Sequence, residues 1–293
     1  MIRHGRTRRR RWLAVLAAAL VAGTAAAQSG ETPSGGTPPP GGRPGGGADV
    51  DAALAFLAKQ QSRDGSFGRA NQLALTGMAG LAFLAAGSTP KRGPHAERIA
   101  KACEFILACQ ADGRAFTHPS SGYSAIHNHG YALLLLTQCL GEAGTLDKRL
   151  RPAIGAAVQA SANSQEKNGG FTYFLYGKQP PEHRDMWSWD EASTTISQIQ
   201  ALRGAREAGF AVASRVLDRA GKYLARSQHK ETGGFPYSIG GGVPRISVEE
   251  GSNKPTFAVT AATAAVLQAL GTYEGDALDR AIAYMETFEP GRT

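Results

Sequence analysis

The sequence predicts an all-α protein made of helical hairpins, and three observations support this fold class. One pattern occurs four times: a helix ends at Gln, the chain turns through Gly, and a Phe follows within a few residues. A loop and a second helix rich in small residues come after each Phe. Alternation of apolar and polar residues is scarce outside the loops, so few strands are expected. The four pairs are Gln61 and Phe67, Gln110 and Phe116, Gln165 and Phe171, and Gln228 and Phe235.

The repeat unit is a pair of helices. The four Gln positions lie 49, 55 and 63 residues apart, which indicates one unit with insertions. We expect the Gly of each turn to adopt a positive φ and the Phe to pack back onto its hairpin. Small residues in the second helices suit an inner ring, where helix axes approach closely. These helices are expected to end at Gly87, Gly144, Gly209 and Gly271.

A ninth helix, at about residues 277–288, follows the four hairpins. The prediction is therefore about four and a half hairpins, with an array that is incomplete at its C-terminus. Connections inside the hairpins are long, at about residues 62–72, 111–126, 166–190 and 229–256, whereas those between hairpins are short. All the long connections must then lie at one end of the array, which is the expected working face.

The N-terminal region has the pattern of an export signal. Six arginines precede residue 12, an apolar stretch follows, and small residues end at Ala27, where we expect cleavage. The alternative is an uncleaved membrane anchor, for which the apolar stretch is short. Residues 28–49 are rich in Gly and Pro and predict a flexible linker, so the repeat domain is assigned to residues 50–293. The expected location is periplasmic or extracellular.

The net charge of +8 does not indicate a nucleic-acid partner, because it is concentrated in the signal. Removing those six arginines from the 32 basic residues leaves 26 against 24 acidic residues. The cysteine count excludes two further classes of protein. With Cys103, Cys109 and Cys139 alone, the chain has too few cysteines for a disulfide scaffold and no Cys-x-x-Cys spacing for a zinc site. Buried free thiols are expected, although Cys139 could reach one of the other two.

The repeat resembles that of protein prenyltransferase β-subunits and squalene/oxidosqualene cyclases. The resemblance covers about residues 50–290 and implies an α/α toroid, with inner and outer helices around a central cavity. Residues 169–173 (Gly-Gly-Phe-Thr-Tyr), residues 190–202 and the Asn128-His129-Gly130 stretch resemble an exported bacterial subgroup of this family.

The chain departs from the family at its catalytic motifs. The Asp-x-Asp-Asp motif with which cyclases protonate their substrate is absent. At the third inner helix, where prenyltransferases hold zinc through Asp-x-Cys, this chain has Asp190-Glu191-Ala192 and lacks the thiolate. The Cys-Gly-Glu-Gln of toroidal thioester domains is absent too. No cofactor and no metal site are therefore expected.

Candidate site residues gather in the long connections. Asp190 and Glu191 are the candidate acid and base, with capping of the third inner helix by Asp190 and Ser193 as the alternative. His129 is the third catalytic candidate, at the start of the second inner helix. Aromatic rings beside carboxylates suit isoprenoid cations, sugar rings or peptide side chains. The candidate ligand-binding residues are His127, Tyr173, Tyr176, Asp185, Trp187, Trp189 and Tyr237.

Three functions remain open from the sequence. The leading hypothesis is an exported toroid that binds an apolar, isoprenoid-like molecule or a peptide of an envelope protein. The first alternative is a divergent terpenoid cyclase or prenyltransferase-type enzyme that uses Asp190, Glu191 or His129. The second is a polysaccharide-active α/α-barrel enzyme, which for hydrolysis needs two carboxylates about 5 to 9.5 Å apart.

Overall fold

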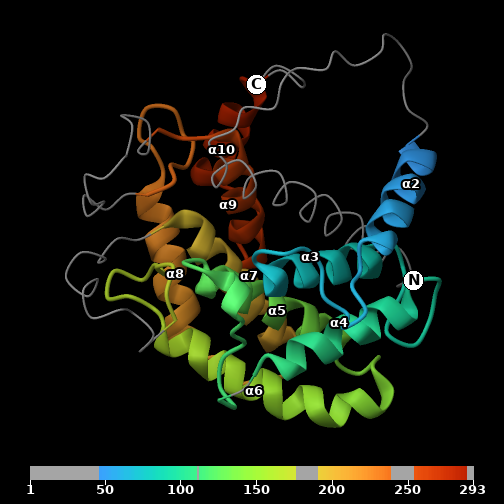
Figure 1. The fold of residues 1–293 in the computed structure, drawn as a ribbon. Coiled ribbons are helices and arrows are strands. Elements are labelled where there is room, and N and C mark those ends of the chain that lie inside the picture. Colours follow the sequence, from blue (N-terminus) through green and yellow to red (C-terminus); the bar gives the residue numbers. More distant parts are fainter. Residues whose placement is uncertain (1–45, 111, 176–190, 239–253, 289–293) are drawn as a thin grey trace, which may run out of the picture.

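The computed structural model describes residues 46–110, 112–175, 191–238 and 254–288. Within these ranges the chain forms nine α-helices and two short 3₁₀ helices, and the β-type pairing there is limited to isolated bridges (Figure 1). None of the described helices is long and apolar enough to cross a membrane. The predicted all-α class is confirmed.

The helices form two layers. Four inner helices pack on one another in chain order, and each of four outer helices lies against the inner helices beside it (Figure 1). This arrangement is an α/α toroid, as expected. The inner helices are α3 (Gln72–Ala85), α5 (Ala125–Cys139), α7 (Ala192–Glu207) and α9 (Phe257–Ala269). The outer ones are α4 (Ala96–Ala108), α6 (Asp147–Asn163), α8 (Ser214–Ser227) and α10 (Asp276–Glu286), and α2 (Gly46–Lys59) precedes them and contacts α3.

Small residues allow the inner helices to approach closely. A Cβ added at Gly77 on α3 would lie 2.5 Å from the carbonyl oxygen of Tyr131 on α5. A Cβ at Gly204 on α7 would lie 2.8 Å from the hydroxyl of Thr137 on α5. Both distances are shorter than atoms can approach, so these glycines set the spacing of the ring.

The repeated Gln explains how each turn is joined to the next hairpin. Its side-chain amide donates to a carbonyl of its own turn and to a carbonyl of the following outer helix. Gln165, for example, donates to Gly169 O at 3.0 Å and to Val216 O of α8 at 2.8 Å. Gln61, Gln110 and Gln228 make the same pair of bonds, reaching Arg98, Ala153 and Ala277 respectively. Consecutive hairpins are thus tied by one side chain.

Glycine is required in the third turn for both a conformational and a steric reason. Gly169 has φ of 98°, and a Cβ there would lie 2.4 Å from the carbonyl oxygen of Arg219 on α8. The Phe residues that follow the turns are buried, as predicted.

Replacing Gln165 with Ala is expected to destabilise the fold by about 1 to 3 kcal/mol, because one carbonyl of its own turn and one of α8 lose their donor. Chemical denaturation would measure the change in free energy of unfolding. Gln159→Ala is the matched control, since Gln159 is exposed on α6 and makes no side-chain hydrogen bond to a described residue. Equal stability of the two variants would contradict the joining role of Gln165.

Two boundaries differ from the expected ones. Helix α2 begins at Gly46, inside the segment expected to be linker. Helix α5 ends at Cys139 instead of Gly144, because Gly141 already takes a positive φ of 88° and Gly144 opens a 3₁₀ turn (Gly144–Leu146). All four of the predicted glycines, Gly144 included, do have positive φ. All three cysteines are free and buried, which confirms the expected buried thiols.

Candidate functional site

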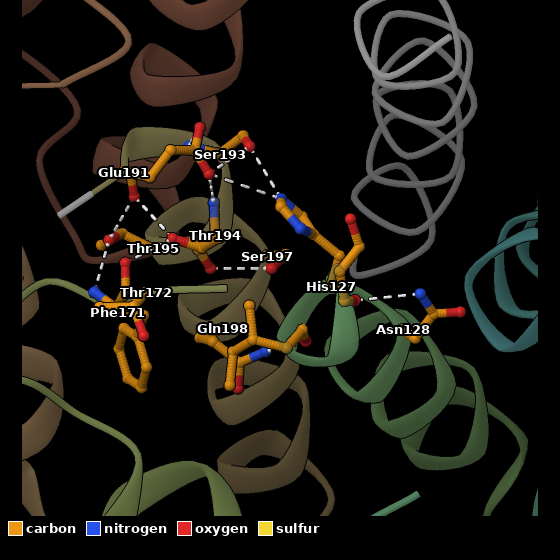
Figure 2. Close-up of polar contacts among 12 residues, drawn as sticks. His127, Asn128, Phe171, Thr172, Glu191, Ser193, Thr194, Thr195, Ser197 and Gln198 are labelled. Atoms are coloured by element: carbon orange, nitrogen blue, oxygen red, sulfur yellow. Dashed lines mark hydrogen bonds and ion pairs between the residues drawn. The ribbon is translucent and has the colours of Figure 1, made fainter. Parts of the chain in front are cut away.

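The N-terminal ends of α5 and α7 bring a buried carboxylate, a hydroxyl and an imidazole together (Figure 2). These ends belong to the long-connection side of the array, which is the expected working face. Glu191 precedes α7 in extended conformation, with φ of −146° and ψ of 133°. Its backbone N–H donates to Phe171 O at 3.3 Å, and the following N–H, of Ala192, donates to Tyr237 O at 2.8 Å. Segments of the third and fourth repeats therefore fix the carboxylate's position.

Glu191 caps α7 with its side chain. Oε1 accepts from the N–H of Ser193 at 2.9 Å, and Oε2 accepts from the N–H of Thr194 at 2.8 Å. The Ser193 hydroxyl lies 2.7 Å from Oε2. The sequence suggests Asp190 and Ser193 as the capping residues, but Glu191 supplies these bonds, because its side chain reaches the exposed N–H groups of the first turn.

Burial sets the protonation of Glu191. The side chain is 1% exposed, and this desolvation raises the pKa of Glu191 to about 7, against the lowering effect of its hydrogen bonds with Ser193 and Thr194. The carboxyl group therefore changes charge near neutral pH, where a group used for proton transfer is most effective.

His127 projects from the first turn of α5 toward the same group (Figure 2). Its Nε2 lies 2.8 Å from Ser193 Oγ and 3.7 Å from Glu191 Oε2, and its ring packs against Tyr173 with centroids 5.7 Å apart. Burial lowers the pKa of His127 to about 4, so the ring is neutral at pH 7. The side chain is 10% exposed, and Nδ1 has no hydrogen bond to a described residue.

The repeat shows that the pair of His127 and Ser193 is not required by the fold. In each repeat, the N–H of the buried Phe donates to a side chain on the inner helix that follows: Thr76, His129, Thr195 or Thr260. Two residues before these acceptors stand Ala74, His127, Ser193 and Ala258. His127 and Ser193 are thus equivalent residues of neighbouring repeats that face each other, whereas the outer two repeats carry alanine there.

His129 takes the structural role that threonine has in the other repeats. Its Nδ1 accepts from the N–H of Phe116 at 3.1 Å, so Nε2 carries the proton and lies 3.1 Å from both Ala157 O and Ser161 Oγ. The residue is fully buried, and this burial lowers the pKa of His129 to about 4. Both ring nitrogens are occupied, so the geometry assigns His129 to the structure and not to the catalytic role expected from the sequence.

The other predicted site residues divide into two groups. Tyr173 and Tyr237 lie at the site: the first contacts His127, and the second contributes its carbonyl to the start of α7. Burial raises the pKa of Tyr237 to about 12, so its hydroxyl stays protonated. Tyr176, Asp185, Trp187, Trp189 and Asp190 lie outside the described residues.

Tyr131 is a site residue that the sequence reasoning missed. It follows His127 by one helical turn, and its buried hydroxyl has no hydrogen-bond partner among the described residues. Burial and the nearby Glu191 carboxylate raise the pKa of Tyr131 above its usual value, which keeps the hydroxyl protonated. Its spacing of four residues from His127 was the available signal, because such residues share a helix face.

The site is polar, and the apolar cavity of the leading hypothesis receives no support from it. Two surface hollows of about 290 and 340 Å³ lie elsewhere, between α6 and α8 and at the C-terminal ends of α5 and α7. Among the described residues, no group of three or more His, Cys, Asp or Glu side chains could hold a metal ion.

Comparison with known proteins gives a likeness of fold. No family model matches the chain, and no curated protein matches it. The structure is similar to that of polysaccharide lyase BACCELL_00875, with a TM-score of 0.50 and 15% sequence identity, over 77% of this chain and 68% of that one. At this identity the likeness supports the α/α architecture, and no match to a prenyltransferase or cyclase family accompanies it.

Proposed function

We propose that the protein is a polysaccharide-active enzyme in which His127 is the general base. The observation that carries this proposal is a neutral imidazole whose Nε2 contacts Ser193, which in turn bonds Glu191, while Nδ1 has no hydrogen bond to a described residue. A base needs an available lone pair and a fixed orientation, and this arrangement supplies both. The fold likeness to a polysaccharide lyase supports the substrate class.

The reaction that best fits these groups is elimination from a uronate-containing chain. His127 Nδ1 removes the proton from the sugar carbon beside the carboxylate, a C=C bond forms, and the bond to the leaving glycosidic oxygen breaks. The leaving oxygen takes up a proton from solvent, and no water is consumed overall. Hydrolysis would need two carboxylates facing the sugar. Glu191, the carboxylate of the described site, has both oxygens engaged at α7.

Incubation of the full-length protein with uronate-containing and neutral polysaccharides would test the proposal. The expected result is ultraviolet absorbance from the new C=C bond, with uronate chains only. New reducing ends without this absorbance would overturn elimination in favour of hydrolysis. Absence of both, together with a lipid or peptide found on the protein by native mass spectrometry, would overturn the enzyme proposal in favour of ligand binding.

A further inference from the structure

The Ser193 hydroxyl lies between two groups that compete for its single proton. Its oxygen is 2.8 Å from His127 Nε2 and 2.7 Å from Glu191 Oε2 (Figure 2). A hydroxyl donates one hydrogen bond and accepts others, so it can donate to only one of these neighbours at a time. The direction of one bond therefore fixes the direction of the other.

We propose that Ser193 is a positioning residue that transmits the protonation state of Glu191 to His127 and thereby selects which imidazole nitrogen carries the proton. This inference concerns the base of the proposed function and extends it. When Glu191 is ionised, Ser193 donates to Oε2 and accepts from Nε2–H. The lone pair is then on Nδ1.

Protonation of Glu191 reverses the chain of bonds. The carboxyl group then donates to Ser193 Oγ, and Ser193 donates to Nε2, which must be unprotonated. The imidazole proton moves to Nδ1, and this nitrogen becomes a donor instead of a base. The ring stays neutral in both states, so the change is one of tautomer and not of charge.

Within the described part of the site, Glu191 is the group that changes charge near neutral pH. Among the described residues, the titratable groups around it are His127 and Tyr131 on α5, Tyr173 beside the His127 ring, and Tyr237 in the fourth connection. Burial lowers the pKa of His127 to about 4 and raises that of Glu191 to about 7, so the two titrations are well separated. The described α3 and α9 carry no titratable side chain.

Nitrogen NMR of the full-length protein with ¹⁵N-labelled histidine would test this relay without any substrate. The His127 signals, assigned by their loss in His127→Gln, are expected to change from the Nδ1–H to the Nε2–H tautomer as pH rises, with a midpoint near 7. Ser193→Ala is expected to abolish this change, and Ser193→Thr, which keeps the hydroxyl, to retain it. The matched control is Ser197→Ala, because Ser197 bonds Thr194 O one turn further along α7.

An unchanged tautomer across this range in the natural protein, or the same transition in Ser193→Ala, would overturn the relay. If the protein shows lyase activity, kcat/KM is also expected to fall roughly tenfold for each pH unit below 7, and Ser193→Ala to lose this dependence. The tautomer change can be observed in a protein that proves inactive on every polysaccharide. The failure of the relay and the failure of the proposed function are therefore distinguishable.

Discussion

Replacing His127 with glutamine is expected to lower kcat/KM on a uronate polysaccharide by about 10²- to 10⁴-fold, the usual contribution of a general base. Glutamine places an amide near the position of Nε2, where it can still bond Ser193, but it offers no basic nitrogen in place of Nδ1. The change thus removes the lone pair of Nδ1 while preserving the polar contact with α7. Initial rates from the absorbance of the unsaturated product would measure it.

The control for this variant is His229→Gln, which changes a histidine in the turn of the fourth repeat. His229 accepts from Thr232 N within that turn and makes no contact with the His127 site among the described residues. Its replacement is expected to leave kcat/KM unchanged. Activity of His127→Gln close to that of the control would show that another group is the base.

The sequence was sufficient to predict the architecture because the repeated Gln, Gly and Phe mark the end of one helix and the start of the following turn in every unit. Each Gln, Gly and Phe has the same local role four times, so agreement between repeats compensates for weak signals in any one of them. Gln228 illustrates this, since an extra residue in its turn leaves its two bonds intact. The start of α2 was harder to predict, because glycines at its first positions resemble linker, whereas the helix extends back to Gly46.

The site was predicted less well, because side-chain chemistry depends on which repeat positions face each other. His127 and Glu191 are candidates from the sequence, but 64 residues separate them in the chain, and their contact through Ser193 depends on the packing of α5 against α7. The role expected for His129 differs from the observed one for a related reason. His129 occupies the position that a threonine has in each of the other three inner helices, where it accepts from the N–H of the preceding Phe. Recognising this equivalence requires an alignment of the inner helices, and the loops between Phe and helix differ too much in length for the sequence alone to fix it.

Replacing His129 with threonine is expected to reduce the acid sensitivity of the fold. The free energy of unfolding that is lost between about pH 7 and pH 4 should be smaller by about 3 kcal/mol in the variant. Folded His129 has a pKa of about 4, below its unfolded value of 6.5, so its neutral form stabilises the fold fully above pH 6.5. This contribution is lost as pH falls from 6.5 toward 4, by about 1.4 kcal/mol for each pH unit between the two pKa values. Threonine cannot ionise and can still accept from Phe116 N–H, as Thr76, Thr195 and Thr260 do for their own Phe residues.

Urea denaturation at about pH 7 and about pH 4 would measure this difference, since stability changes wherever the folded and unfolded states bind protons differently. At pH 7 the variant is expected to be less stable by about 1 to 3 kcal/mol, because Ala157 O and Ser161 Oγ lose the ring N–H. The contributions of His127 and of Glu191, whose raised pKa acts in the opposite direction, are common to both proteins and cancel in the comparison.

Thr76→Ala is the control: it removes the equivalent bond from the first repeat without removing a titratable group, so it should lower stability equally at both pH values. If His129→Thr also lowered the free energy of unfolding equally at both pH values, burial would not be holding the His129 ring neutral. That result would contradict the structural role assigned to His129.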